Sequence, residues 1–166
     1  MQKTYIKAQQ LLDDSFRLGS MVLRDDFRPD YILGVLRGGA PVAMVVHEFL
    51  DFHGVRSDYI GIRVLSYSGI DQQSEVVKVD GLDYVVQKIK TARSLLIVDD
   101  IFDSGRTMQE LMKYLGNLIS TKQNLSIRIA TVYFRSPRNK ISVQPDYFVH
   151  RTDKWLVFPH ELQGLT

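Results

Sequence analysis

A short, fully apolar stretch that runs directly into two adjacent carboxylates constrains this chain more than any other feature. Leu95–Val98 reads Leu-Leu-Ile-Val and is followed by Asp99 and Asp100, and a small-residue segment at 103–107 reads Asp-Ser-Gly-Arg-Thr. Such a run is typical of a strand buried on both faces, as in the parallel sheets of α/β proteins. Ligands of these proteins bind beyond the carboxyl ends of the strands, so we expect the functional site here.

Strand-like and helix-like segments alternate along the chain. Apolar runs typical of strands cover 31–36, 58–64, 95–98 and 127–134, with shorter candidates at 147–149 and 156–158. Amphipathic spacing indicates helices over about 5–22, 41–50, 82–92 and 108–119. This order predicts an α/β fold with a mostly parallel sheet flanked by helices. No repeat, low-complexity tract or linker interrupts it, so we expect a single domain over residues 1–166.

The composition narrows the class of protein. Of the 166 residues, 45% are hydrophobic and 24% are charged, which is typical of a globular chain. No apolar run approaches the roughly 20 residues that span a bilayer, and Met1–Gln10 is too polar for a signal peptide. Cysteine is absent, which excludes disulfides and thiolate metal sites and favours a cytoplasmic protein. Because the net charge is only +2, we expect neither nucleic acid nor a membrane as a partner.

The segment after the acidic pair suits a sugar phosphate. Ser104, Thr107 and the backbone N–H groups around Gly105 can face a phosphate at the start of a helix, where the helix dipole favours an anion. The acidic pair can accept hydrogen bonds from ribose hydroxyls and lies near a hard cation. The simpler alternative is that Asp103 or Ser104 only caps the helix. That alternative explains one residue, but not three aspartates within five positions followed by Ser-Gly-Arg-Thr.

The stretch Val98–Thr107 resembles the signature with which type I phosphoribosyltransferases bind 5-phosphoribosyl-1-pyrophosphate (PRPP). The resemblance implies the type I phosphoribosyltransferase fold, with a core over about 25–132, a small C-terminal hood over 133–166 and the N-terminal helix packed nearby. It implies Mg²⁺ as cofactor and Asp103 as the catalytic acid/base near N7 of the base. The residues then expected to bind PRPP are Arg37, Gly38, Gly39, Asp99, Asp100, Asp103, Ser104, Gly105, Arg106 and Thr107.

Two earlier segments resemble further parts of this family, in the same order along the chain. The Arg-Gly-Gly segment 37–39 resembles the loop that grips pyrophosphate, because glycines let backbone N–H groups approach oxygens and arginine adds a cation. The polar stretch 65–74 resembles the lid that closes over the reacting centre, with Ser66 and Tyr67 as its Ser-Tyr pair. An ordinary surface loop is the alternative, and Arg63 is a further candidate for holding pyrophosphate.

The C-terminal segment resembles the hood of xanthine-guanine and related purine phosphoribosyltransferases. In that hood an aromatic ring stacks on the purine, a position taken here by Trp155, and the backbone of the next residue, Leu156, reads the base edge. A place in the core is the alternative for this tryptophan. The same correspondence puts Glu161 near a second magnesium ion, while Asp100 lies nearer the first.

One position departs from that pattern. 6-Oxopurine enzymes place a lysine after the strand expected at 127–134, where it donates to O6 of the purine, and this chain has Arg135 there. Arginine also donates to a carbonyl oxygen, but its planar fork is not equivalent to an ammonium group. Lys140 is the alternative donor if the loop is placed differently.

Together these segments predict an enzyme that transfers the phosphoribosyl group of PRPP to a 6-oxopurine, namely guanine, hypoxanthine or xanthine. Three alternatives stay open: transfer to adenine or a pyrimidine, a regulatory protein that senses PRPP without turnover, and a phosphate-binding domain of unrelated chemistry. Members of the family are usually dimers or tetramers, so the resemblance also implies a homodimer or homotetramer.

Overall fold

The computed structural model describes residues 3–67, 76–81, 86–118, 124–138 and 141–162, without the side chains of 65–67, 76–78 and 137. The elements in chain order are β1 (Lys3–Tyr5), α1 (Ala8–Arg24), β2 (Tyr31–Val35), α2 (Gly39–Phe52), β3 (Asp58–Tyr67), β4 (Val76–Asp80), α3 (Val86–Ile89), β5 (Ser94–Phe102), α4 (Arg106–Leu118), β6 (Ser126–Phe134), the 3₁₀ turn η1 (Ser136–Arg138), β7 (Tyr147–Arg151) and β8 (Trp155–Val157).

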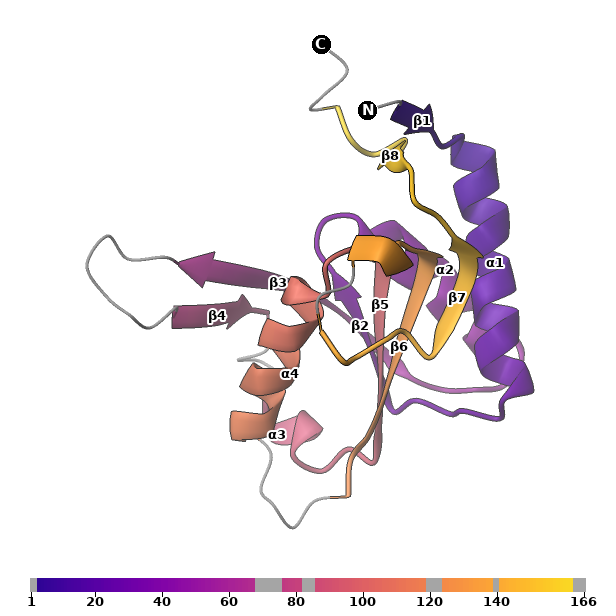
Figure 1. Ribbon diagram of the computed structural model, residues 1–166. Coiled ribbons are helices and arrows are strands. Elements are labelled where there is room, and N and C mark those ends of the chain that lie inside the picture. Colours follow the sequence, from indigo (N-terminus) through magenta and orange to yellow (C-terminus); the bar gives the residue numbers. More distant parts are fainter. Residues whose placement is uncertain (1–2, 68–75, 82–85, 119–123, 139–140, 163–166) are drawn as a thin grey trace.

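Six strands form the main sheet, in the order β4-β3-β2-β5-β6-β7. All neighbours are parallel except β3 and β4, which form an antiparallel hairpin that projects from the body of the molecule (Figure 1). In the sheet, β3 lies on one side of β2, and β5, which comes later in the chain, lies on the other side. The order therefore reverses between β2 and β5, and the loops that follow these two strands open into the crevice where such sheets bind ligands.

Helices cover both faces of this sheet and make two separate cores. On one face, α1 and α2 pack through Leu18, Val22 and Val46 against strand residues such as Leu96. On the other face, α4 packs through Leu111 and Leu115, together with the short α3. Successive residues of β5 point into opposite cores, which is why Leu95–Val98 is apolar without interruption. The predicted α/β fold, with a mostly parallel sheet between helices, is confirmed.

A second, two-stranded sheet joins the two ends of the described chain. Strand β1 pairs in parallel with β8, and the amide of Ile6 donates to the carbonyl of Val157 at 2.9 Å. Helix α1 also contacts the C-terminal part directly, because the His150 imidazole lies 2.8 Å from the buried Asp14 carboxylate. The strand that carries Trp155 is therefore held from the N-terminal side of the molecule (Figure 1).

The element boundaries differ from the predictions in several places. Strand β3 continues through Tyr67, where the sequence predicts a loop from residue 65, because it pairs with the unpredicted strand β4. Strand β5 continues to Phe102, so the acidic pair lies inside the strand and not beyond its end. The described helix over the predicted 82–92 segment is only Val86–Ile89, and β1 was not predicted. In the described part of the chain, no helix is long and apolar enough to cross a membrane.

Candidate active site

A cavity of about 310 Å³ lies at the carboxyl end of β5, and its walls are the continuous stretch Asp99–Met108. The acidic pair Asp99–Asp100 and the segment 103–107, which together we call the phosphoribose cradle, all line it. The strand brings the acidic pair to the cavity, and the turn before α4 brings Ser104, Gly105 and Thr107. The backbone N–H groups of the first turn of α4 have no carbonyl partner within the helix, which makes this wall favourable for an anion.

The carboxylates of Asp99 and Asp100 lie close together in the cavity. Asp100 is buried, and its amide donates to Oδ1 of Asp99 at 2.9 Å. Burial, and then the negative charge of Asp100, raise the pKa of Asp99 well above its ordinary value. Ribose hydroxyls that donate to these oxygens, or a cation beside them, would offset this repulsion. The acidic pair therefore suits a ligand that brings both hydroxyl donors and a cation.

The turn between β5 and α4 has the geometry that a close phosphate requires. Gly105 has a φ of +80°, a conformation that residues with a side chain rarely adopt. The hydroxyl of Ser104 lies 3.5 Å from the amide of Arg106, at the limit of a hydrogen bond. The helix-capping alternative therefore explains only this weak contact of Ser104. The side chain of Thr107 is exposed, so a ligand can reach it.

The segment 37–39 lies directly beside the acidic pair, because β2 and β5 are neighbours. The peptide bond that leads into it, between Leu36 and Arg37, is cis. A Cβ atom on Gly38 would overlap the carboxylate of Asp100, and one on Gly39 would overlap the carbonyl of Val98. Both glycines are therefore required by the close approach of the loop after β2 to strand β5, about 60 residues later in the sequence.

Arg135, whose side chain is almost completely buried, lies beside the cavity and contacts Asp103 of its wall. Its Nη1 atom lies 3.2 Å from Oδ2 of Asp103, and its Nη2 atom donates to the carbonyl of Lys154 at 2.5 Å. The guanidinium carbon lies 5.4 Å from the ring centroid of Trp155, which is 43% exposed. The exposure of this ring argues against its alternative place in the core. Asp103, Arg135 and Trp155 thus form one group beside the phosphoribose cradle.

Two contacts at the site were not predicted from the sequence. Nε2 of His160 lies 3.0 Å from Oδ2 of Asp100, and this hydrogen bond is the main cause that raises the pKa of His160. The imidazole also stacks on Phe158, with ring centroids 5.4 Å apart. The second is an ion pair at 3.5 Å between Nε of Arg138 and Oδ1 of Asp103. No local pattern distinguishes either residue, because both contacts join segments that meet only in the folded sheet.

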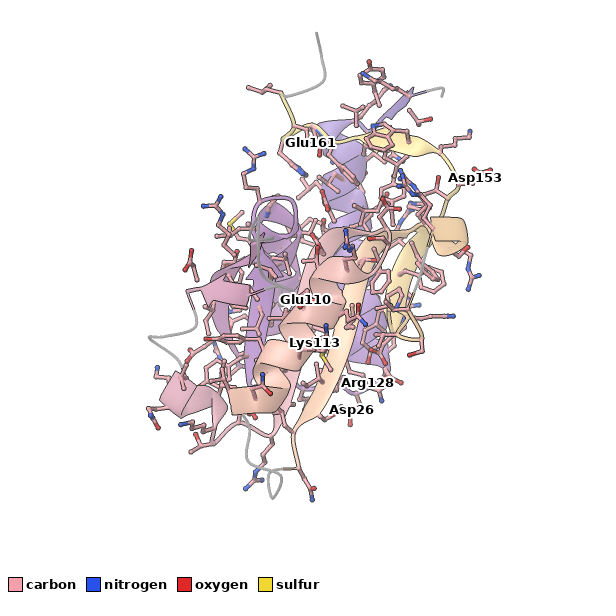
Figure 2. The ribbon with its side chains drawn as sticks, turned by 60° about the vertical axis from the view of Figure 1, so that its left-hand side comes forward. Asp26, Glu110, Lys113, Arg128, Asp153 and Glu161 are labelled. Atoms are coloured by element: carbon pink, nitrogen blue, oxygen red, sulfur yellow. The ribbon has the colours of Figure 1, made fainter. Side chains whose placement is uncertain are left out.

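The structure does not bring every predicted residue to the cavity. Glu161 is exposed, and its carboxylate accepts from the amide of Phe158 at 3.1 Å; Figure 2 shows it near the strand that carries Trp155. Lys140 lies outside the described residues, as do the side chains of Ser66 and Tyr67, whose backbone belongs to β3. Within the described ranges, no group of three or more His, Asp and Glu side chains is arranged to hold a metal ion.

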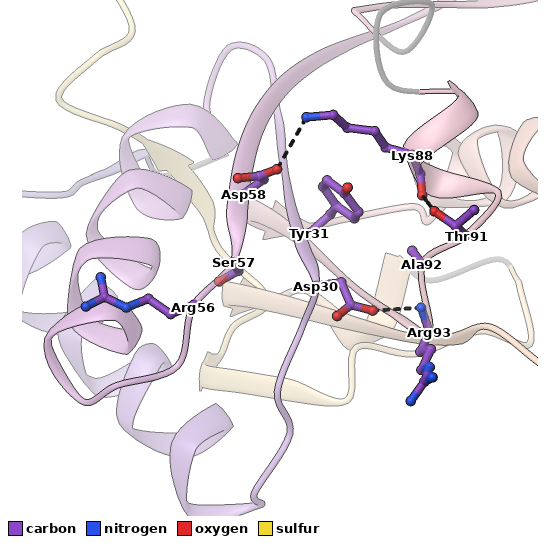
Figure 3. Close-up of a pocket in the computed structure, with 9 residues that line it drawn as sticks. All are labelled: Asp30, Tyr31, Arg56, Ser57, Asp58, Lys88, Thr91, Ala92 and Arg93. Atoms are coloured by element: carbon purple, nitrogen blue, oxygen red, sulfur yellow. Dashed lines mark hydrogen bonds and ion pairs between the residues drawn. The ribbon is translucent and has the colours of Figure 1, made fainter.

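A larger hollow of about 580 Å³ lies at the opposite edge of the sheet, among the amino ends of β2, β3 and β5 (Figure 3). Its charged groups mainly hold the loops together. The carboxylate of Asp30 accepts from the amides of Arg93 and Ser94, and Lys88 lies 3.7 Å from Asp58. These contacts explain the polar lining structurally, and parallel sheets bind ligands at the other edge. We therefore place the active site at the carboxyl ends of the strands.

Comparison with known proteins agrees with this geometry. Residues 1–163 match the phosphoribosyl transferase domain family. A hypoxanthine-guanine phosphoribosyltransferase of Lactococcus lactis is 28% identical over 148 residues, which are 89% of this chain and 75% of that protein. A purine phosphoribosyltransferase of Pyrococcus horikoshii is 30% identical, with a TM-score of 0.72 over 97% of this chain and 95% of that one. A xanthine-guanine-hypoxanthine phosphoribosyltransferase of Helicobacter pylori shares the fold at 21% identity, with a TM-score of 0.68 over 95% and 92% of the two chains. The chain belongs to the phosphoribosyl transferase domain family and is a phosphoribosyltransferase.

Proposed function

We propose that this enzyme transfers the phosphoribosyl group of PRPP to a 6-oxopurine, giving a nucleoside 5′-monophosphate and pyrophosphate. The grouping of Asp103, Arg135 and Trp155 beside the cradle carries the proposal. It offers a carboxylate, a cationic donor and an exposed aromatic face, which match the N7, O6 and ring of such a base. Relatives named for hypoxanthine, guanine and purine substrates support the same class of base.

PRPP occupies the cradle in this proposal. The turn 104–107 and the first amides of α4 bind the 5′-phosphate, and Asp99 and Asp100 accept from the ribose hydroxyls. The segment 37–39 binds the pyrophosphate with backbone N–H groups and the exposed guanidinium of Arg37. Because β2 and β5 are adjacent, one ligand reaches both loops at once.

The cradle also fits a magnesium ion. Asp99 and Asp100 are neighbouring carboxylates, and burial, followed by the charge of Asp100, raises the pKa of Asp99. Carboxylates are hard oxygen ligands of the kind that Mg²⁺ prefers, and Mg²⁺ needs few protein ligands when phosphates supply the others. Asp100 would hold it, whereas Glu161, which does not line the cavity, is not placed to hold a second ion there. When bound with PRPP, magnesium offsets the negative charge of the departing pyrophosphate.

The base binds between Trp155 and the phosphoribose. Its ring stacks on the indole, the backbone of Leu156 reads its edge, and Arg135 donates to O6 in the place where related enzymes use lysine. A purine nitrogen then bonds to C1 of the ribose as the bond from C1 to pyrophosphate breaks. Asp103 accepts the proton that N7 loses. The protein otherwise contributes placement and charge compensation.

We also propose that the described chain works as one domain, with a core over about 25–132 and a hood over 133–166 that supplies the base-binding residues. The pairing of β8 with β1, in a sheet separate from the main one, supports a distinct hood around Trp155, whereas β7 within the same range is the edge strand of the main sheet. A homodimer or homotetramer is the proposed assembly. Exposed apolar side chains on α1 and α2, such as Leu12 and Met44, support it.

The test is an assay with PRPP, magnesium and each of adenine, guanine, hypoxanthine, xanthine, uracil and orotate, while pyrophosphate release is followed. We expect turnover with at least one 6-oxopurine and not with the pyrimidines. Asp103→Asn should lower kcat by about 100-fold or more with little change in PRPP affinity. Turnover of adenine or a pyrimidine alone would overturn the assignment of the base. Binding of PRPP without turnover of any base would favour a PRPP-sensing regulatory protein.

A further inference from the structure

Arg138 reaches the same carboxylate as Arg135. The 3₁₀ turn η1 brings both side chains to one side, because residues three apart eclipse each other in such a turn, and the amide of Arg138 donates to the carbonyl of Arg135 at 3.1 Å. Nη1 of Arg135 lies 3.2 Å from Oδ2 of Asp103, and Nε of Arg138 lies 3.5 Å from Oδ1. One guanidinium therefore faces each oxygen of the carboxylate.

The two arginines differ in how firmly they are held. Arg135 is 4% exposed, its Nη2 atom is bound by the carbonyl of Lys154, and its guanidinium lies over Trp155. The side chain of Arg138 is 48% exposed and its ion pair with Asp103 is longer. The buried arginine is thus held beside Trp155 by partners other than Asp103, while the exposed one is able to follow the carboxylate.

A conflict arises at Arg135 when a base binds. The guanidinium that now bonds Asp103 is also the proposed donor to O6 of the purine. If Arg135 turns toward the base, Oδ2 of Asp103 loses its partner. In the described part of the chain, Oδ1 is buried and accepts no hydrogen bond, so the charge of Arg138 is what remains near it.

We propose that Arg138 is a positioning residue that holds and charge-compensates the Asp103 carboxylate while Arg135 engages the base. This inference rests on the proposed function. Arg138 touches neither substrate, and it acts only through Asp103. A half-exposed ion pair that does nothing else is the competing explanation, and such pairs contribute little. The two explanations differ in what happens when Asp103 is already changed.

A double-mutant cycle separates them, with Arg138→Gln, Asp103→Asn and the double variant assayed on the 6-oxopurine that the wild type uses best. We expect Arg138→Gln to lower kcat about three- to tenfold without changing the KM for PRPP. In the Asp103→Asn background the same substitution should have no further effect, since the group through which it acts is gone. Arg138→Lys, which keeps the charge, should recover most of the activity.

Two results would overturn the inference: an unchanged kcat in Arg138→Gln, or equal losses from this substitution in both backgrounds. Binding of PRPP measured by calorimetry, and thermal unfolding of each variant, show whether a loss reflects misfolding. A wild type inactive on every base removes the proposed function itself, whereas an active wild type with an indifferent Arg138→Gln removes only this inference.

Arg56→Gln is the matched control. Arg56 also forms an arginine–aspartate ion pair, at 2.6 Å with Asp51, but it is 80% exposed and lies at the opposite edge of the sheet (Figure 3). We expect its kcat and both KM values to equal those of the wild type. A loss in this control comparable to that in Arg138→Gln would mean that removal of any arginine charge lowers activity, and the inference would fall.

Discussion

Gly38 lies against the carboxylate of Asp100 so closely that no Cβ atom fits between them. The two residues are 62 positions apart and belong to the loop after β2 and to β5, which are neighbours in the sheet. This contact joins the loop proposed to bind pyrophosphate to the acids proposed to bind ribose. The geometry of one part of the PRPP site therefore depends on the other.

We expect Gly38→Ala to damage the PRPP site. The added methyl group must displace Asp100 or the loop, and such overpacking costs about 1–3 kcal/mol of stability. The KM for PRPP should rise about tenfold or more, because both loops shift relative to one ligand. Steady-state kinetics and urea unfolding measure the two effects.

Gly116→Ala is the control for this substitution. Gly116 lies within α4, and a Cβ atom there would meet nothing within 4 Å. Alanine should raise the free energy of unfolding by about 0.5–1 kcal/mol, since it restricts the unfolded chain more than glycine does. If Gly38→Ala bound PRPP as well as this control does, the close contact with Asp100 would be wrong.

We expect Trp155→Ala to impair binding of the base and to leave PRPP unaffected. Loss of a stacking surface worth about 1–3 kcal/mol should raise the KM for the base roughly 5- to 150-fold. For Trp155→Phe, which keeps a smaller aromatic face, the KM for the base should lie between those of the wild type and Trp155→Ala. Phe52→Ala removes an exposed ring, 85% accessible, at the end of α2 and should change neither KM. An equal rise in both KM values for Trp155→Ala would contradict the stacking role.

We expect His160→Ala to loosen the C-terminal segment. The substitution removes a 3.0 Å hydrogen bond to the buried Asp100 carboxylate and a stack on Phe158. The free energy of unfolding should fall by about 1 kcal/mol, and amide exchange over 155–161 should become faster. His160→Gln, which keeps a donor, should lose less. Unchanged exchange in His160→Ala would show that the contact does not hold the hood.

We expect Tyr133 to make the protein sensitive to alkali. Burial, and then the charge of Asp14, raise the pKa of Tyr133 from 10.0 to about 12. The folded state binds the proton of the Tyr133 hydroxyl more tightly than the unfolded state does. The contribution of this proton to the free energy of unfolding is therefore complete below pH 10.0 and is lost as the pH rises toward about 12. Over that pH range the free energy of unfolding of the wild type should fall by roughly 1–3 kcal/mol more than that of Tyr133→Phe. Unfolding at neutral pH supplies the baseline, and equal losses in both proteins would contradict the prediction.

The local pattern was sufficient for the main elements near the site. Leu95–Val98 alternates between two cores and so must be apolar throughout, and this pattern alone identified β5 and its acids. Strand β4 was missed, although residues 77–80 alternate apolar and charged residues as a strand does, because the segment is short and directly follows a polar loop. The extension of β5 to Phe102 was missed because aspartates rarely continue a strand, and here pairing with β6 overrides that preference.

The sequence by itself determined the succession of the main strands and helices along the chain. It also determined the acidic strand with its small-residue turn and the glycine pair after β2. These features depend on residues within one or two turns or strands of each other, where periodicity and backbone freedom act. Only the tertiary structure decided that Arg135 and Arg138 share Asp103, that His160 meets Asp100 and that β1 holds the strand carrying Trp155. Those contacts depend on which strands become neighbours in the sheet, and residues distant in sequence meet only once the cores on both faces are packed.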